Sequence, residues 1–395
     1  MIYSDFQEKK LSLLGFGAMR LPLVEGGTAG DIDQAQVDAM VDYAIANGVN
    51  YFDTAFPYHE SMSEVAIGKA LSRYPRDKYN LATKYPGHQI SESYNPAEVF
   101  EEQLVKCGVD YFDFYLLHNV NENSIGVYKD PRWGILDYFV EQKRLGRIKH
   151  LGFSCHGGVD CIKEFLDFAG DSMEFCQIQL NYMDWTLQNA KAKYELFAER
   201  GIPVWVMEPV RGGKLANLGE DEAKLKALRP DESIPAWAFR WLQRLPDVKM
   251  ILSGMSNLEQ MIDNVKTFGE RNALSDEECE VIYAVSDKMK NSVPCTGCRY
   301  CVEGCPKELD IPLLIALYND QRVYSSMNIA QRLDSLGPEK HSSQCIGCGQ
   351  CAMVCPQGID IPKHMRDMTR AFKSLPNWAE LCRQREEAAK KMKAK

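Results

Sequence analysis

The sequence lacks any apolar run long enough to cross a lipid bilayer, and its N-terminus has no basic lead followed by an apolar core and a cleavage site. It also lacks an excess of basic charge, since 46 lysines and arginines stand against 55 aspartates and glutamates, for a net charge of -9. These absences argue against a membrane anchor, a secretory leader and a nucleic-acid or anionic-membrane partner. We therefore expect a cytoplasmic protein.

Disulfides are not expected either, although the chain has 14 cysteines. In a reducing compartment, cysteines serve more often as metal ligands, small buried side chains or reactive thiols. The composition, with 45% hydrophobic and 26% charged residues, is that of a globular protein with ample material for a core. At 395 residues the chain exceeds one average domain, so we expect one large domain and a smaller one.

Most of the cysteines lie in two runs near the C-terminus, CTGCRYCVEGCP at 295–306 and CIGCGQCAMVCP at 345–356. Both follow the spacing C-x2-C-x2-C-x3-C-P, typical of bacterial [4Fe-4S] ferredoxins, in which the fourth cysteine binds the other cluster. The spacing predicts two crossed ligand sets, Cys295, Cys298, Cys301 and Cys355 for one cluster and Cys345, Cys348, Cys351 and Cys305 for the other. Structural zinc sites are the alternative, but they usually have two separated C-x2-C pairs.

The segment between the two runs, IPLLIALYNDQRVYSSMNIAQRLD, has apolar residues at helical rather than alternating intervals. This unit therefore resembles the alpha-helical ferredoxin modules. The other six cysteines have no such spacing, and we expect most of them to be packing residues. They are Cys107, Cys155, Cys161, Cys176, Cys279 and Cys382.

From about residue 10 to 270, short apolar runs alternate with longer amphipathic patterns, several of which end at glycine. Eight strand-like runs lie near residues 13, 49, 79, 112, 148, 175, 203 and 249. Eight beta-alpha units in about 260 residues match a (β/α)8 or TIM barrel. An open doubly wound sheet is the alternative, but the helix expected after a glycine fingerprint does not follow LGFGAMRLP.

The predicted fold is therefore α/β, a TIM barrel followed by a small, mainly helical ferredoxin-like domain. We place the barrel at 1–275, a connecting helix at 276–292 and the two-cluster domain at 293–365. Residues 366–395 are expected to form a C-terminal helix or a basic tail, and the pattern assigns them no function.

Polar residues follow consecutive strands of the predicted barrel. Asp53 and Tyr58 follow the second strand, Lys84 the third and His118 the fourth. Each alone is more often a surface or hydrogen-bonded residue, but barrel chemistry lies at the C-terminal strand ends, where the four would meet. Together they suit proton transfer to a carbonyl: Tyr58 donates, Lys84 supplies a neighbouring cation, and Asp53 holds that lysine. His118 would bind the carbonyl oxygen, and a hydride donor would complete the reduction.

The segments YFDTAFPYHE, LATKYP and DFYLLH resemble the aldo-keto reductase superfamily, whose Asp, Tyr, Lys and His tetrad falls on these four residues. The resemblance covers roughly residues 10–270. It implies NADP(H) bound without a Rossmann fold, and carbonyl reduction or the reverse oxidation. It also implies nicotinamide contacts and an adenosine-phosphate segment, which fall on Ser154, Gln177, Ser256, Gln260 and Asn264.

The chain departs from the usual residues of that family at three positions. Met207 stands where an aromatic residue often stacks on the nicotinamide. Cys155 stands where asparagine commonly follows the serine. Gln260 stands where many members hold the 2'-phosphate with arginine.

Together the two parts resemble aldo-keto reductases that carry a C-terminal ferredoxin module. A nicotinamide transfers two electrons as hydride, whereas a [4Fe-4S] cluster normally passes one. Electrons crossing between the parts would therefore need a flavin, a radical-tolerant substrate or an external ferredoxin partner. The segment VRGGKL makes Arg211, Gly212 and Lys214 candidates for a phosphate of nicotinamide or flavin cofactors, with a solvated basic loop as the alternative.

Three hypotheses for the function follow. The first is an oxidoreductase that acts on a carbonyl or related small-molecule substrate while the clusters relay single electrons. The second is a conventional NADPH-dependent reductase whose clusters are structural or redox-sensing, and the third is a nucleotide-binding regulatory protein. The substrate loops have no diagnostic charge cluster, and for His88, Tyr85 and Trp133 surface or packing roles are favoured over a pocket.

Overall fold

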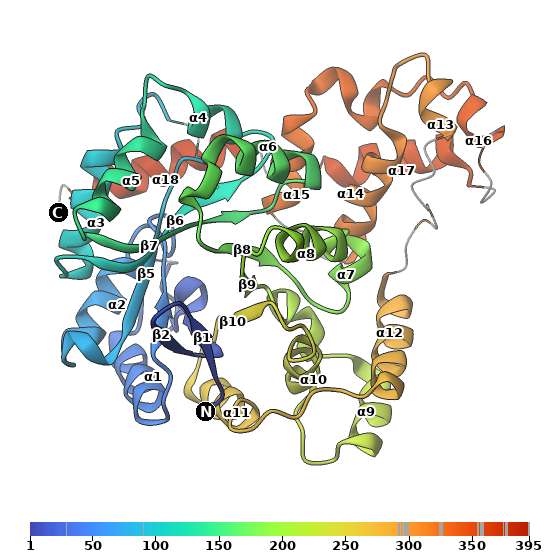
Figure 1. The fold of residues 1–395 in the computed structure, drawn as a ribbon. Helices are drawn as coiled ribbons and strands as arrows, with labels where there is room; N and C mark the ends of the chain where they lie inside the picture. The colour runs from blue at the N-terminus through green and yellow to red at the C-terminus, as the bar shows by residue number, and fades with distance from the viewer. Residues whose placement is uncertain are drawn as a thin grey trace.

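Eight parallel strands close into a barrel (Figure 1). The computed structural model describes residues 1–28, 30–89, 91–290, 293, 295, 300–323, 327–353, 355, 359–373, 375 and 378–393. The barrel strands are β3 (Leu14–Gly17), β4 (Tyr51–Asp53), β5 (Asn80–Tyr85), β6 (Phe112–Val120), β7 (Ile148–Cys155), β8 (Cys176–Gln179), β9 (Val204–Met207) and β10 (Val248–Ser253). Each pairs with the next, and β10 closes the ring on β3. The predicted TIM barrel is confirmed, with every strand in its predicted run.

Helices surround the barrel, and some of them, such as α1, α3, α10 and α11, begin at a polar side-chain cap. At the start of α3, the Asn95 side chain accepts hydrogen bonds from the backbone N–H groups of Ala97 and Glu98, which the helix itself leaves unpaired. The barrel helices are α1 (Gln34–Ala46), α2 (Ser63–Leu71), α3 (Pro96–Cys107), α4 (Ile125–Lys129), α5 (Ile135–Arg144), α6 (Val159–Ala169), α7 (Asp184–Leu187), α8 (Ala190–Glu199), α9 (Glu222–Leu228), α10 (Ile234–Leu242) and α11 (Leu258–Thr267).

A hairpin that the sequence analysis did not anticipate covers the N-terminal end of the barrel. Strands β1 (Tyr3–Phe6) and β2 (Lys9–Ser12) pair antiparallel. The Phe6 ring lies 4.9 Å from that of Trp205 and 5.7 Å from that of Phe114, inside a cluster of buried apolar side chains. Because this packed layer fills the interior, polar chemistry is left to the opposite end, where the strands finish.

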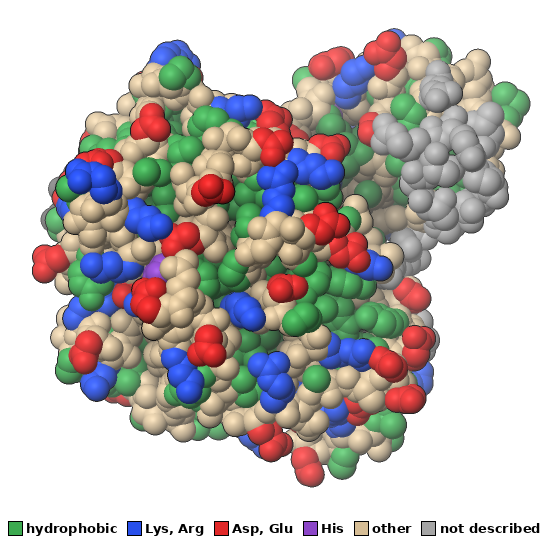
Figure 2. Space-filling view, viewed as in Figure 1, with side chains coloured by type: hydrophobic (Ala, Val, Ile, Leu, Met, Phe, Trp, Pro, Cys, Tyr) green, Lys and Arg blue, Asp and Glu red, His purple; other side chains and the backbone are tan. Residues whose placement is uncertain are grey.

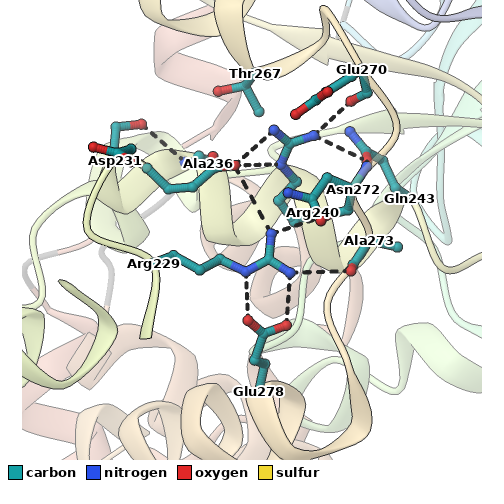
Figure 3. A network of polar contacts seen from close by, with 12 residues as sticks. Arg229, Asp231, Ala236, Arg240, Gln243, Thr267, Glu270, Asn272, Ala273 and Glu278 are labelled. Atoms are coloured by element: carbon teal, nitrogen blue, oxygen red, sulfur yellow. Dashed lines mark hydrogen bonds and ion pairs between the residues drawn. The ribbon is translucent and has the colours of Figure 1, made fainter. Parts of the chain in front are cut away.

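Arg229 ties the helix that leaves the barrel, α12 (Asp276–Lys290), to the barrel wall, and Arg240 holds the loop that precedes it (Figure 3). Arg229 donates to both carboxylate oxygens of Glu278, at 2.6 and 2.8 Å. Arg240 on α10 donates to the backbone oxygen of Glu270 at 2.7 Å. A two-pronged contact between a guanidinium and a carboxylate resists rotation, so the start of α12 has a defined direction.

The rest of the chain forms a helical lobe, most of which lies at the upper right of Figure 1, whereas its last helix is drawn at the left of the view, toward the C-terminus. Its helices are α13 (Tyr300–Glu303), α14 (Ile311–Val323), α15 (Met327–Ser335), α16 (Gln350–Met353), α17 (Ile361–Phe372) and α18 (Trp378–Lys393). Buried apolar residues of α14 and α17, such as Leu314, Leu317 and Met368, form its core. The predicted mainly helical C-terminal region is thus confirmed.

The helical lobe packs on the C-terminal ends of the barrel strands. Asn119 near the end of β6 donates to Gln331 on α15 at 3.0 Å. The buried Arg211 guanidinium, beyond β9, contacts Asp184 of the barrel at 3.0 Å and Asp320 on α14 at 3.2 Å. These buried polar contacts join residues up to 212 positions apart, so the lobe forms part of the wall around the barrel mouth.

Acidic and basic side chains are interspersed over the face seen in Figure 2. Within the described ranges, no helix is both long enough and apolar enough to cross a membrane.

Candidate active site

A cavity of about 410 Å³ opens at the C-terminal ends of the barrel strands. Both lobes line it. The barrel contributes Gly17, Asp53, Tyr58, His88, His118, Gln177, Met207, Gly212, Ser256, Gln260 and Asn264, and the helical lobe contributes Asn328, Gln331, Trp378 and Arg385.

The tetrad predicted from the sequence comes together at this cavity. Lys84 at the end of β5 is fully buried, and its Nζ donates to Asp53 Oδ1 at 2.5 Å and to the backbone oxygen of Thr54 at 2.7 Å. The same Nζ lies 5.0 Å from the centre of the Tyr58 ring. The His118 ring stands edge-on to the Tyr58 ring, with 5.8 Å between their centres. Tyr58 and His118 therefore face one space from adjoining strand ends.

Burial sets the protonation states of this group. Burial raises the pKa of Tyr58, an effect that the Lys84 charge only partly offsets. Burial alone would lower the pKa of Lys84, but Asp53 and Tyr58 outweigh it and the net pKa is raised. Burial, and then the neighbouring His88 and Lys84, lower the pKa of His118 well below its usual range. At neutral pH the site thus holds a protonated phenol, an ammonium ion and a neutral imidazole.

The region where the nicotinamide is expected contains a hydrogen-bond acceptor without a partner among the described residues. Gln177 Oε1 is buried and has no hydrogen-bond partner among the described residues. Gly17 also lines the cavity, and a Cβ added there would stand 3.2 Å from the backbone oxygen of Ser253, closer than an ordinary contact. A buried amide acceptor that lines the cavity without a partner in the described part of the chain fits the carboxamide of a nicotinamide ring. Ser154, by contrast, does not line the cavity, and its Oγ accepts the backbone N–H of Asn119 at 2.8 Å.

The expected adenosine segment follows β10 and begins α11. Gln260 Oε1 accepts the backbone N–H of Ser256 at 2.8 Å, and Asn264 donates to the Ser253 hydroxyl at 2.9 Å. Asp263 and Arg20 also line the cavity, and a Cβ added to Gly254 would stand 3.3 Å from Arg20 Cγ.

The three residues predicted to contact a phosphate, Gly212, Arg211 and Lys214, differ in where the structure places them. Gly212 lines the cavity. Arg211 does not line the cavity, because its guanidinium is buried against Asp184 and Asp320. The interpretation of Arg211 as a phosphate ligand is therefore corrected: it forms an ion pair between the lobes. The side chain of Lys214 lies outside the described part of the chain.

Sequence reasoning missed the contribution of the helical lobe, and for His88 it favoured a surface or packing role over the cavity that this residue lines. The Trp378 ring stacks on the His88 ring at 5.7 Å and 25°, and both line the cavity. A signal was present: Trp378, Cys382 and Arg385 are spaced to share one face of a helix within an otherwise polar segment. Tyr85 and Trp133 pack against aromatic neighbours, as favoured from the sequence.

The described cysteines of the two runs lie in the helical lobe. Cys305 of the first run lines one small cavity with Cys345, Cys348 and Cys351 of the second. Gly349 in the second run has a φ of 81°, which glycine adopts without strain, so the loop can turn tightly around that cavity. No three His, Cys, Asp or Glu side chains of the described residues are arranged to hold a single ion.

The other predicted ligand set is described in part. Cys301 is buried in the core of the helical lobe, and Cys295 and Cys355 pack against that core. Cys298 lies outside the described residues.

A closed barrel with a buried lysine beside a tyrosine, joined to a cysteine-rich helical lobe, defines an oxidoreductase built from two modules. The aldo/keto reductase family profile matches residues 13–287, well over half of the chain, and a 4Fe-4S dicluster domain profile matches residues 294–359. The chain therefore belongs to the aldo/keto reductase family and carries a C-terminal iron–sulfur domain. The resemblance stated from the sequence is confirmed.

Individual relatives are distant. The NADH-specific methylglyoxal reductase of Escherichia coli (strain K12) is 26% identical over 327 residues, which cover 71% of this chain and 96% of that protein. L-galactose dehydrogenase of Arabidopsis thaliana is 23% identical over 317 residues, covering 71% and 92%. The solved structure of aldo-keto reductase AKR11C1 from Bacillus halodurans in its holo form is 27% identical, with a TM-score of 0.57 over 72% of this chain and 96% of its own.

Proposed function

We propose that the protein reduces the carbonyl group of a small molecule, or oxidises the corresponding alcohol, with a nicotinamide cofactor. The observation that carries this proposal is the buried Lys84, held by Asp53 at 2.5 Å and lying 5.0 Å from the Tyr58 ring. A bound dihydronicotinamide would supply hydride to the carbonyl carbon. Tyr58 donates its hydroxyl proton to the carbonyl oxygen and later recovers a proton from water.

The other tetrad residues act on that proton transfer. The Lys84 ammonium stabilises the phenolate that Tyr58 becomes, and Asp53 keeps the ammonium in place. Neutral His118 donates an N–H to the carbonyl oxygen and so orients the substrate.

The nucleotide would lie along β8, β9 and β10. Gln177 Oε1 would accept the carboxamide N–H, with Met207 beside the ring and Ser154 behind it. Gly212, Ser256, Gln260 and Asn264 would contact the phosphates and the adenosine. Uncharged Gln260 next to Asp263 gives little attraction for a 2'-phosphate, and one relative is named NADH-specific. We therefore propose that NADH serves as well as NADPH, with a flavin as the alternative at Gly212.

We further propose that two [4Fe-4S] clusters are bound by the crossed cysteine sets. The shared cavity of Cys305 with Cys345, Cys348 and Cys351 supports the crossing. If the sets are crossed, Cys305→Ala and Cys348→Ala each remove the same cluster, and the double variant loses no more iron than either single variant. Iron and sulfide per chain in anaerobically prepared protein are the measurement, with Cys161→Ala as the control for a buried non-ligand thiol. Loss of all iron in the double variant alone would mean that each run binds its own cluster.

The clusters are proposed to relay single electrons between the barrel and an external redox partner such as a ferredoxin. A structural or redox-sensing role is the second candidate. It is favoured by the arrangement in Figure 1, where α13 and α16 lie on the side of the helical lobe away from the barrel, beyond α14 and α15.

One anaerobic experiment tests both the proposed carbonyl reduction and the proposed electron relay by the clusters. Protein with its full complement of clusters is mixed with NADH or NADPH and then with methylglyoxal and aromatic aldehydes. Nucleotide absorbance and the broad iron–sulfur absorbance are recorded together. Aldehyde-dependent oxidation of a nucleotide is expected, and its absence for both nucleotides contradicts carbonyl reduction. Bleaching of the clusters is expected if they relay electrons, whereas full turnover without bleaching supports the structural or sensing role.

A further inference from the structure

The helical lobe places a cation in the catalytic cavity. Arg385 on α18 lines the cavity together with Tyr58 and His118. Its guanidinium carbon lies 5.4 Å from the centre of the Trp378 ring, and that ring stacks on His88 at 5.7 Å. The Arg385 charge is close enough to lower the pKa of both His88 and His118, although burial is the main cause for each. The guanidinium therefore lies on the substrate side of the tetrad.

Arg385 has no acidic partner in the part of the chain that the structure describes. Burial lowers its pKa, opposed only by the thiol of Cys382. The three carboxylates that line the cavity are engaged elsewhere. Asp53 holds Lys84, Glu208 lies 3.8 Å from Arg20, and Asp263 accepts the hydroxyl of Ser233 at 2.6 Å. A guanidinium keeps its charge in such a place, and the charge is left for a ligand.

That ligand is not the expected nucleotide. In the ring order of the barrel, β5 and β6 lie opposite β9 and β10. The proposed nucleotide contacts Met207 and Ser256 belong to the β9 and β10 side. Arg385 contacts Trp378, which stacks on His88 beyond β5. The His88 ring lies 4.4 Å from that of His118 near the end of β6. The anion that Arg385 attracts therefore belongs to the second ligand of the cavity.

We propose that Arg385 binds an oxyanion group of the substrate, a carboxylate or a phosphate, while the substrate's carbonyl lies beside Tyr58. The planar fork of the guanidinium matches the two oxygens of such a group. Trp378 supports the guanidinium from one face and closes the wall through His88. This inference rests on the proposed carbonyl reduction and names its substrate class: carbonyl compounds that carry an acidic group. The C-terminal helix α18, which follows the iron–sulfur domain, thereby supplies part of the substrate site of the barrel.

Binding of small probes tests the anion site without any turnover. Dissociation constants for benzoate, phenyl phosphate and neutral benzamide are measured by calorimetry on the full chain with its clusters. Arg385→Met is expected to weaken the binding of benzoate or phenyl phosphate by about 10- to 100-fold. The binding of benzamide, which has no charge, is the reference. Arg385→Lys should recover part of the affinity, and the exposed neighbour Arg383→Met on the same helix should change nothing. Circular dichroism and melting of each variant check that α18 is retained.

Turnover provides the second test. The kcat/KM values for the three isomeric carboxybenzaldehydes are compared with those for their methyl esters in each variant. Arg385→Met should lower the acid-to-ester ratio by a similar factor, and the dissociation constant for NADH should not change with it. An unchanged ratio and unchanged benzoate affinity would overturn the inference even if aldehydes are reduced. Weaker NADH binding by the same factor would also overturn it, because the cation would then serve the nucleotide. Absence of all aldehyde reduction with Arg385-dependent benzoate binding would contradict the proposed reaction but support the anion site.

Discussion

Replacing Tyr58 with phenylalanine is expected to lower kcat for carbonyl reduction by about 10²- to 10⁴-fold. Phenylalanine keeps the ring that packs near His118 but removes the only hydroxyl of the tetrad, so no proton donor remains beside Lys84. Steady-state kinetics with NADH or NADPH measure the loss. Nucleotide binding should be unchanged, because the hydroxyl is not among the proposed nucleotide contacts.

The control for this variant is Tyr85→Phe, since Tyr85 is buried in aromatic packing and does not line the cavity. It should keep the activity of the wild type. Equal loss in both variants, or activity retained in Tyr58→Phe, would contradict the assignment of Tyr58 as proton donor. A biological effect that survives in Tyr58→Phe without turnover would instead favour a regulatory protein.

The pH dependence has a definite sign. Because burial raises the pKa of Tyr58, the phenol stays protonated through the neutral range, and kcat/KM for reduction should decline only at alkaline pH. Alcohol oxidation needs the deprotonated phenol as a base, so its rate should rise with pH over the same range. No inflection from His118 is expected near neutral pH, since its pKa is lowered well below the usual range.

The second large effect concerns the contact between the lobes. Arg211→Met is expected to lower the free energy of unfolding by about 3–5 kcal/mol, because it leaves Asp184 and Asp320 buried without their shared cation. Denaturant unfolding followed by cluster absorbance and by barrel tryptophan fluorescence measures the change. The signal of the helical lobe should be lost at a lower denaturant concentration than that of the barrel.

Asp320→Asn is the matched control. Burial, and then the Asp184 charge, raise the pKa of Asp320 to about 7. A raised pKa in the folded state means that the protonated form stabilises the fold. This contribution is complete below about pH 4 and is lost as the pH rises through about 7. The free energy of unfolding of the wild type should therefore fall between about pH 4 and about pH 7. The Asp320→Asn variant should not show this fall. Equal stability of Arg211→Met and the wild type at pH 7.5 would contradict the role of the ion pair.

Features that depend on neighbouring residues could be predicted well from the sequence. All eight barrel strands lie in their predicted runs, since each apolar run is long enough to be buried on its own. The tetrad could be located because strand ends of a parallel barrel meet at one face. The hairpin β1–β2 was missed, since two four-residue strands leave almost no periodic pattern.

Features that depend on distant segments were missed or misjudged. Arg211 looked like a phosphate ligand because its loop is basic and rich in glycine, but Asp320, 109 residues away, occupies its guanidinium. His88 was expected to pack or to lie at the surface, because nothing near it in the sequence indicates that Trp378 stacks on it. The contribution of α18 to the cavity wall was missed for the same reason.

By itself the sequence determined a barrel of eight units, a tyrosine and lysine at its mouth, and two cysteine runs with the spacing of cluster ligands. These follow from apolar periodicity and short spacings, which act within a few residues of the chain. Only the tertiary structure decided that the helical lobe lies over the barrel mouth, that Arg211 joins the lobes, and that Arg385 lines the same cavity as Tyr58. Such contacts depend on how two separately formed surfaces fit together, and that fit is a property of their shapes and charges in space, which no local pattern encodes.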